Sequence, residues 1–360
     1  MLQAKLVLED KSEFHGFSFG FPRSNQGEVV FNTGMTGYPE SLTDPSYQGQ
    51  ILVATYPLIG NYGIPKENKK NHLSTVFESD RIHLNGFIVS NYSRKFNHWR
   101  KKESLSRFLK TQKIPGVCGI DTRSLTKKLR QKGVLLGRVL IGKDASMPAR
   151  EAAKNIIDPN TRDLVAEVST NQIETFGQGK KKIICLDCGM KNNIIHSLLK
   201  FDVTLKKVPS KYDFRKQSFD GLLISNGPGD PQTNKQLIEN IRWALKKKKP
   251  IFGICLGNQI MALAAGAKTY KLKYGHRGQN QPCLEIGTNR CYLTSQNHGF
   301  TVNPKTLPKQ WKVWFKNIND GTVEGIYHQS NRFFSVQFHP EACPGPQDTK
   351  WLFKKFIDKL

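Results

Sequence analysis

The sequence predicts an α/β protein with two domains: an N-terminal α+β domain, followed by a doubly wound domain with a mostly parallel sheet. Its 360 residues exceed what a single hydrophobic core usually serves. Short alternating stretches dominate the first part, whereas strands and amphipathic helices take turns after Lys182. We therefore expect a first domain over residues 1–145, a connector over 146–180 and a second domain over 181–360.

In the first domain, apolar and polar residues alternate in stretches such as AKLVLED, GEVVFNTG and QILVATYPLIG. Glycine, proline, asparagine and aspartate separate these stretches, which is typical of short strands joined by turns. Helical spacing is found in ESLSRFLKTQ and TRSLTKKLRQKG. The second of these helices is expected to begin at a cap formed by Asp121 or Thr122 and to end at Gly133. The connector is polar, with one short predicted helix.

In the second domain, the predicted strands are KKIICLD, DVTLKKV, FDGLLISNG and PIFGIC. The predicted helices are NNIIHSLLKF, NKQLIENIRWALKKK and the segment after Cys255. Apolar strands that alternate with amphipathic helices form βαβ units, and such units build a parallel sheet that is buried on both faces.

The composition predicts a soluble cytoplasmic protein. No apolar run approaches the length of a membrane-spanning helix, and acidic residues lie in the first segment where a signal peptide would be apolar. The seven cysteines are odd in number and widely spaced, which indicates reduced thiols and not a disulfide framework.

The formal net charge of +26 raises the possibility of a nucleic-acid partner. However, the basic residues lie in many short runs, and no motif for a groove-reading helix or an RNA-binding sheet accompanies them. We therefore expect no nucleic-acid partner. The charge is interpreted mainly as solvated surface, with an acidic protein partner as the alternative.

The stretch GICLGNQ at residues 253–259 joins a predicted strand to a predicted helix. Its G-x-C-x-G spacing is that of a nucleophile elbow, in which flanking glycines permit a strained turn that displays the side chain. At the start of the helix, the positive end of the helix dipole stabilises the thiolate of Cys255, and the amide of Leu256 can donate to an oxyanion. The alternative is a small cysteine buried where strand and helix pack.

A base for this thiol is predicted in FFSVQFHPEACPGP, residues 333–346. Pro340 favours an extended backbone at His339, so the side chains of His339 and Glu341 should point the same way, as a base and its orienting carboxylate must. For an isolated HPE, a surface turn would be the better interpretation. The glycine turn in ISNGPGDP, residues 224–231, adds a third element at the carboxyl edge of the sheet, where ligands of open α/β sheets collect.

The motifs NGPGDP, GICLGNQ and VQFHPEA, in this order, resemble the class I (triad) glutamine amidotransferase family. The stretches FNTGMTGYPESLTDPSYQGQ, TYPLIGNYG, CGIDTRSLTKKLRQKG, LKYGHRGQNQP, TSQNHGFTV and HPEACPGPQD further resemble the small subunits of glutamine-dependent carbamoyl-phosphate synthetases. The likeness runs from about Ala4 to the C-terminus, so that it covers both domains.

The resemblance implies a catalytic triad and a set of glutamine-binding residues. Cys255 would be the nucleophile, His339 the base and Glu341 its partner. Glutamine would be bound by residues from several loops and by backbone amides: Ser46, Gly227, Gly229, Leu256, Gln259, Asn297, Gly299 and Phe300. Ser46 belongs to the first domain, and a turn serine after a proline is an equally good interpretation of it from the sequence alone.

The resemblance also implies a division of labour with a large subunit. The chain would hydrolyse L-glutamine, and the large subunit would combine the ammonia with bicarbonate and two ATP into carbamoyl phosphate, for arginine and pyrimidine synthesis. The sequence contains no P-loop motif. ATP and a divalent metal are therefore expected on the large subunit, and no cofactor or metal site is expected in this chain.

Three alternatives bear on these expectations. The C-x-x-C pair Cys185 and Cys188 lacks a second pair or a histidine, which favours strand-end thiols over a zinc or redox site. A glutaminase for another synthase, such as one for anthranilate or GMP, would keep the triad without the first domain. A non-catalytic basic binding protein would explain the charge but not the motifs.

Overall fold

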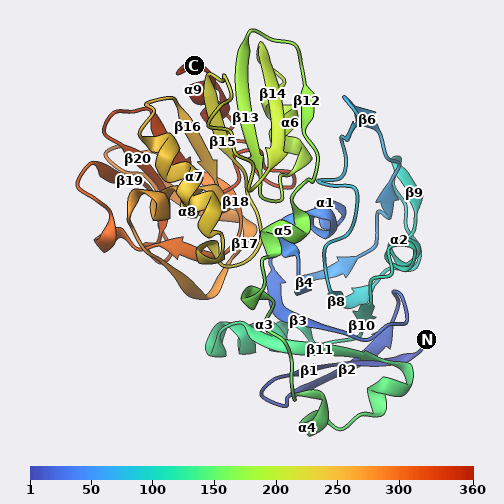
Figure 1. Ribbon diagram of the computed structural model, residues 1–360. Coiled ribbons are helices and arrows are strands. Elements are labelled where there is room, and N and C mark those ends of the chain that lie inside the picture. The colour runs from blue at the N-terminus through green and yellow to red at the C-terminus, as the bar shows by residue number, and fades with distance from the viewer. The chain divides into compact units, whose positions relative to one another are not determined.

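The computed structural model describes residues 1–360 without a gap, and the chain divides into two compact units (Figure 1). Unit 1 comprises Met1–Asn160 and unit 2 comprises Thr161–Leu360. The division lies within residues 146–180, where the sequence predicts the connector. That segment contributes helix α4 (Ala149–Ala152) to unit 1 and helix α5 (Leu164–Val168) to unit 2.

Unit 1 is built on a closed barrel, in the strand order β1-β11-β3-β4-β8-β10-β2. The pairs β3–β4, β4–β8 and β8–β10 are parallel and the other neighbours are antiparallel. The strands of the barrel are β1 (Gln3–Leu8), β2 (Glu13–Ser18), β3 (Asn25–Asn32), β4 (Gln50–Ile59), β8 (Gly86–Tyr92), β10 (Gly116–Cys118) and β11 (Leu135–Ile141).

Besides α4 and short 3-10 helices, unit 1 also contains three α-helices and two short ribbons. The ribbons pair β5 (Ile64–Pro65) with β9 (Lys101–Glu103) and β6 (Lys69–Lys70) with β7 (Leu73–Ser74). The helices are α1 (Tyr38–Thr43), α2 (Leu105–Thr111) and α3 (Thr122–Lys132). The predicted cap of α3 is confirmed, because the Asp121 side chain accepts from the Ser124 amide, and Gly133 ends the helix. The predicted α+β character of this half is thus confirmed.

Unit 2 contains a ten-stranded sheet in the order β12-β14-β13-β15-β16-β21-β20-β19-β17-β18. Its centre, from β14 to β21, is parallel, which confirms the predicted parallel sheet, and the flanking strands are antiparallel. The strands are β12 (Glu174–Phe176), β13 (Lys181–Asp187), β14 (Val203–Pro209), β15 (Gly221–Ile224), β16 (Ile251–Ile254), β17 (Thr269–Glu285), β18 (Cys291–Val302), β19 (Trp311–Asn317), β20 (Val323–His328) and β21 (Phe333–Val336).

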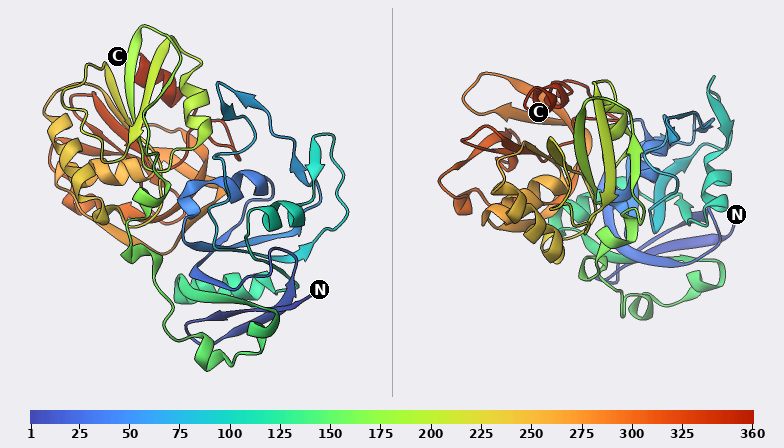
Figure 2. Two further views of the ribbon diagram at one scale, coloured as in Figure 1. Left: turned by 45° about the vertical axis from the view of Figure 1, so that its right-hand side comes forward. Right: turned by 45° about the horizontal axis from the view of Figure 1, so that its top comes forward.

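Helices cover both faces of the parallel centre, as a doubly wound fold requires. Figures 1 and 2 show α7 (Lys235–Leu245) and α8 (Leu256–Ala265) lying together on one face, in yellow and gold. Ile251 packs with these two helices, whereas the next residue, Phe252, contacts Phe353 and Phe356 of α9 (Trp351–Ile357). Helix α6 (Asn192–Leu198) connects β13 to β14. Because successive strand residues point to opposite faces, both faces of β16 are buried.

The carboxyl ends of four parallel strands meet at one edge of this sheet. Strands β13, β15, β16 and β21 end at Asp187, Ile224, Ile254 and Val336, and the segments after them carry the residues that the sequence singles out. No helix in the chain combines the length and apolar composition that crossing a membrane requires.

Candidate active site

Cys255 lies between β16 and α8 in a backbone conformation that residues with a side chain rarely adopt, with φ 54° and ψ −102°. Its amide donates to the carbonyl oxygen of Val336 at 2.8 Å, which ties the turn to β21. The flanking glycines are required by close contacts. A Cβ on Gly253 would lie 2.6 Å from the Gly257 carbonyl oxygen, and a Cβ on Gly257 would lie 2.2 Å from that of Ile224. The G-x-C-x-G spacing therefore follows from the packing of backbone on backbone.

The expectation that this elbow displays its thiol to solvent is wrong, because Cys255 is only 2% exposed. Segments from elsewhere in unit 2 cover the sulfur. Sγ lies 3.7 Å from the Asn297 carbonyl oxygen on β18 and 3.7 Å from Nε2 of Gln337, just beyond β21. The thiol therefore lies in an enclosed site, where bulk water is excluded and electrostatic interactions are strong.

His339 and Glu341 form the pair that the sequence predicts. The amide of His339 donates to the Ser295 carbonyl oxygen at 2.9 Å, which fixes the segment against β18. Nδ1 of His339 lies 2.7 Å from Oε1 of Glu341, and both side chains are buried. The other ring nitrogen, Nε2, is buried and has no hydrogen-bond partner. Nε2 is thus available to exchange a proton with the thiol or with a bound ligand.

Lys191 is a residue of this candidate site that the sequence did not point to. It lies between β13 and α6, is buried, and places Nζ 3.1 Å from Oε1 of Glu341 and 2.6 Å from the Ala342 carbonyl oxygen. The neighbouring Asn193 donates from Nδ2 to the Glu341 carbonyl oxygen at 2.5 Å. Their position directly after a parallel strand, at the edge where the other motifs meet, was the signal that could have identified them.

Burial and charge act in opposite directions on the buried pair. Burial disfavours the imidazolium, but Glu341 and the nearby Cys255 raise the pKa of His339 above its ordinary value. Burial likewise disfavours the carboxylate, but Lys191 and His339 hold the pKa of Glu341 below its ordinary value. The charged forms of both side chains are favoured as a result.

Two backbone amides beside Cys255 donate no hydrogen bond within the protein: those of Gly227 and Leu256. The two residues are neighbours, because a Cβ on Gly227 would lie 2.8 Å from Cδ2 of Leu256. It would also lie 2.1 Å from the Cys188 carbonyl oxygen, so only glycine fits there. Amides that are held in place without an acceptor can stabilise an oxyanion.

The remaining predicted glutamine-binding residues of unit 2 lie around the thiol to differing extents. Gln259 is buried, but its Nε2 is already committed to the Phe300 carbonyl oxygen at 2.8 Å and to Oε1 of Gln337 at 3.1 Å. The side-chain oxygen of Gln259, in contrast, makes no hydrogen bond within the protein. We therefore expect Gln259 to contact substrate through this oxygen alone. Asn297 and Gly299 are on the same strand, β18, as Phe300.

Gly229 and Ser46 are placed less directly by the structure. Gly229 has φ +82°, a conformation that favours glycine, in the loop after β15. Ser46 lies in unit 1, in a short 3-10 helix (Pro45–Tyr47), where its amide donates to the side chain of Asp44 at 2.9 Å. The parts of both residues in binding glutamine stay predictions.

Two family profiles match the chain in succession. The one described as carbamoyl-phosphate synthase small chain, CPSase domain, matches residues 6–139, and the one described as glutamine amidotransferase class-I matches residues 184–359. The two matched segments lie in unit 1 and unit 2, respectively.

Curated relatives match 99% of the chain. They include multifunctional protein CAD of Squalus acanthias, 53% identical over 360 residues, and multifunctional protein pyr1-3 of Dictyostelium discoideum, 48% identical over 377 residues. A mitochondrial carbamoyl-phosphate synthase of Mus musculus, named for ammonia, is 47% identical over 362 residues. The chain spans 16%, 17% and 24% of the length of these three proteins.

Proposed function

The chain belongs to the class I glutamine amidotransferases, in the branch that carries a carbamoyl-phosphate synthase small-chain domain, and from this premise we propose that it hydrolyses glutamine and passes the ammonia to a carbamoyl-phosphate synthetase. The observation that carries the proposal is the arrangement at the sheet edge. A strained Cys255 lies beside His339, whose Nδ1 is held 2.7 Å from the Glu341 carboxylate. A nucleophile near a base, and an orienter in contact with that base, are the parts that acyl transfer needs.

In the first half-reaction, Sγ of Cys255 attacks the side-chain amide carbon of glutamine and its proton is held at Nε2 of His339. The carbonyl oxygen becomes an oxyanion, which accepts hydrogen bonds from the amides of Gly227 and Leu256. As the carbon–nitrogen bond breaks, His339 donates its proton to the leaving nitrogen. The products are ammonia and a γ-glutamyl thioester on Cys255.

In the second half-reaction, His339 takes a proton from water, which attacks the thioester carbon. The carbon–sulfur bond breaks, glutamate leaves, and the thiol of Cys255 is regenerated. Glu341 keeps Nδ1 protonated and the ring in place during both halves, while Lys191 holds that carboxylate. Neither Glu341 nor Lys191 exchanges a proton with substrate.

For substrate binding, we propose a pocket formed by Gly227, Gly229, Leu256 and Gln259 together with the β18 residues Asn297, Gly299 and Phe300. Glycines let the main chain approach a ligand closely. The uncommitted oxygen of Gln259 suits the α-ammonium group of glutamine. We propose Ser46 as a further contributor, from unit 1.

The proposed partner is a large synthetase subunit or domain that holds ATP and a divalent metal. It would make carbamoyl phosphate from the ammonia, bicarbonate and two ATP, for arginine and pyrimidine biosynthesis in the cytoplasm. Two observations support a partner of this kind: the small-chain profile matches residues 6–139, and the curated relatives are four to six times longer than the region they share with this chain. The small-chain match also favours this assignment over a glutaminase for another synthase.

The test is a glutaminase assay on the purified chain, with glutamate and ammonia both measured. We expect slow hydrolysis by the chain alone and faster hydrolysis when the large subunit is added, since assembly should complete the pocket. One relative is named for ammonia and not for glutamine, which makes this test necessary. If the chain hydrolyses no glutamine, either alone or with the large subunit, then it does not supply ammonia from glutamine and the proposal is wrong.

A further inference from the structure

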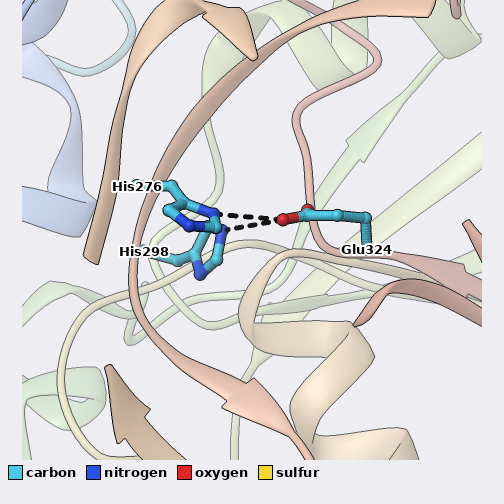
Figure 3. Close-up of side chains that lie close together, drawn as sticks. All are labelled: His276, His298 and Glu324. Atoms are coloured by element: carbon cyan, nitrogen blue, oxygen red, sulfur yellow. Dashed lines mark hydrogen bonds and ion pairs between the residues drawn. The ribbon is translucent and has the colours of Figure 1, made fainter. Parts of the chain in front are cut away.

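Four buried polar side chains converge on one point in unit 2, and the proposed hydrolysis of glutamine uses none of them. They are His276 of β17, Gln296 and His298 of β18, and Glu324 of β20. Figure 3 shows both imidazole rings directed at the Glu324 carboxylate. Nδ1 of His276 lies 3.1 Å from Oε1 of Glu324, and Nε2 of His298 lies 3.8 Å from the same oxygen.

In each imidazole ring, the nitrogen that faces away from Glu324 contacts an acceptor, and this contact determines which ring nitrogen carries the proton. Nδ1 of His298 lies 2.9 Å from the Phe300 carbonyl oxygen, which can only accept, so Nδ1 donates and the lone pair is on Nε2. Nε2 of His276 lies 2.8 Å from Oδ2 of Asp320, which likewise accepts. The neutral form of His276 therefore has its lone pair on Nδ1. Both lone pairs point to the centre of the cluster.

The side-chain amide of Gln296 presents a third lone pair. Its Nε2 lies 3.0 Å from Oγ1 of Thr294, and the hydroxyl hydrogen of Thr294 is donated to the Gln281 carbonyl oxygen at 2.8 Å. Thr294 must therefore accept from Gln296, which turns Oε1 of Gln296 toward the two rings. That oxygen lies 3.0 Å from Nδ1 of His276 and 3.1 Å from Nε2 of His298.

Burial lowers the pKa of His276, but Asp320 and Glu324 raise it above its ordinary value, so a second proton on His276 can separate some of these acceptors when no cation is bound. Few other hydrogen atoms are available. The donors that reach Oε1 of Glu324 from outside the cluster are Nδ2 of Asn317 at 3.5 Å and Oγ1 of Thr322 at 3.4 Å, both at the long limit of a hydrogen bond. Oε2 of Glu324 is buried and has no hydrogen-bond partner. Buried acceptors that face one another repel unless a proton or a cation lies between them.

We propose that this cluster binds one divalent transition-metal ion, with Zn²⁺ as the best fit, through Nδ1 of His276, Nε2 of His298, a carboxylate oxygen of Glu324 and Oε1 of Gln296. Imidazole and carboxylate are ligands that Zn²⁺ takes in proteins. Bonds of about 2.0–2.1 Å in a tetrahedron separate the ligand atoms by about 3.3 Å. The separations in the structure, 3.0, 3.1 and 3.8 Å, lie on either side of that value.

The surroundings of the cluster also match those of a metal site. Ligating histidines usually donate their other ring N–H to a carboxylate or a backbone carbonyl, which orients the ring. Asp320 serves His276 in this way and the Phe300 carbonyl serves His298. A metal here would join β17, β18 and β20, and would hold the β18 segment in which Asn297 and Gly299 flank His298.

The test measures binding of Zn²⁺ itself to the full chain. The protein is stripped with a strong chelator, then titrated with Zn²⁺ against a competing indicator, and the bound metal is counted after gel filtration. We expect one equivalent per chain and a higher melting temperature with the metal. Co²⁺ in place of Zn²⁺ should give visible absorption bands without a thiolate-to-cobalt charge-transfer band, because the four ligands are nitrogen and oxygen.

Substitutions separate this site from other metal-binding groups. Glu324→Gln and His276→Gln should each abolish stoichiometric binding. Asp320→Asn, at a half-exposed position that the fold tolerates more readily, should weaken binding about 10–100-fold. His328→Gln is the matched control, because His328 is on β20 with Glu324 but outside the cluster. This variant should bind Zn²⁺ as the unaltered chain does. Three results would each overturn the proposal. The first is less than a tenth of an equivalent of Zn²⁺ bound per chain at micromolar free Zn²⁺. The others are a charge-transfer band from thiolate to cobalt, and binding of Zn²⁺ by Asp320→Asn as tight as by the unaltered chain. None of these readouts depends on glutaminase activity.

Discussion

Nδ1 of His339 lies 2.7 Å from Oε1 of Glu341, two residues further along the chain, and Nζ of Lys191 approaches the same oxygen at 3.1 Å from another strand end. One carboxylate oxygen therefore holds both a base and a buried ammonium group. This contact sets the tautomer of neutral His339 and leaves Nε2 as the ring nitrogen without a hydrogen-bond partner.

Replacing the nucleophile should separate the two halves of the reaction. Cys255→Ser should abolish glutamine-dependent carbamoyl phosphate synthesis by the assembled enzyme, because a serine hydroxyl is a poor nucleophile in a site built for a thiolate. Synthesis from added ammonium salts should stay nearly unchanged. The measurement is carbamoyl phosphate formed from each nitrogen donor. An equal loss with both donors, in a correctly assembled complex, would give Cys255 a role beyond glutamine hydrolysis.

A glutamine analogue that carries a diazo-ketone should label Cys255 and spare the other six cysteines. The proposed glutamine site should bind the analogue next to Cys255, whereas burial raises the pKa of Cys185 to about 12 and keeps that thiol unreactive. Iodoacetamide, which needs no recognition, should instead modify the exposed Cys291 first. Peptide mapping with and without competing glutamine decides the matter. Analogue on Cys291 that glutamine does not displace would count against a substrate site at Cys255.

Glu341→Gln should lower the rate of glutamine hydrolysis by about 10²- to 10⁴-fold relative to the unaltered chain. This loss is smaller than the one expected for Cys255→Ser. Nucleophile and base stay in place, but the neutral amide no longer favours the imidazolium or a single tautomer of His339. The pH dependence of kcat should shift as well, since the carboxylate raises the pKa of His339. A slower enzyme with an unshifted pH profile would mean that Glu341 only supports the local structure.

The His339 pair should make stability depend on pH in a defined direction. The native pKa of His339 is raised above the ordinary value of 6.5. Its contribution to stability is therefore fully present below pH 6.5 and is lost as the pH rises toward the native pKa. We expect the free energy of unfolding of the unaltered chain to exceed that of His339→Asn most at about pH 6, and the difference to shrink above pH 7. Denaturant titrations at several pH values measure it, and a difference that grows with pH would contradict the assignment.

Gly257→Ala should destabilise unit 2 by about 1–3 kcal/mol, since overpacking of a tight backbone contact forces neighbours apart. The added Cβ would lie 2.2 Å from the Ile224 carbonyl oxygen, which is backbone and cannot rotate away. Glutaminase activity should fall with stability, because the contact positions the turn that bears Cys255. Thermal unfolding and kinetics of the purified variant provide the check, and an unchanged melting temperature would show that the elbow has room to relax.

Local sequence determined much of this site. The glycines around Cys255 predict the elbow because only glycine permits backbone contacts this close. The predicted contact of His339 with Glu341 is present, but the chain there is not extended: Pro340 and Glu341 lie in a turn, in which the Ala342 amide donates to the His339 carbonyl oxygen at 3.0 Å. Periodicity likewise predicted the parallel strands and the helix that Asp121 caps, since hydrophobic burial has a period of two in strands and 3.6 in helices.

Tertiary packing decided the rest, because contacts between residues far apart in sequence leave no periodic signal. Only the fold shows that Asn297 and Gln337 enclose the Cys255 thiol, or that Lys191, some 150 positions earlier, neutralises Glu341. The same holds for His276, His298 and Glu324, each unremarkable in its own strand. Strand order brings their ring nitrogens and carboxylate to one buried point, and only there does the shortage of hydrogen-bond donors arise that makes the cluster a candidate for a metal ion.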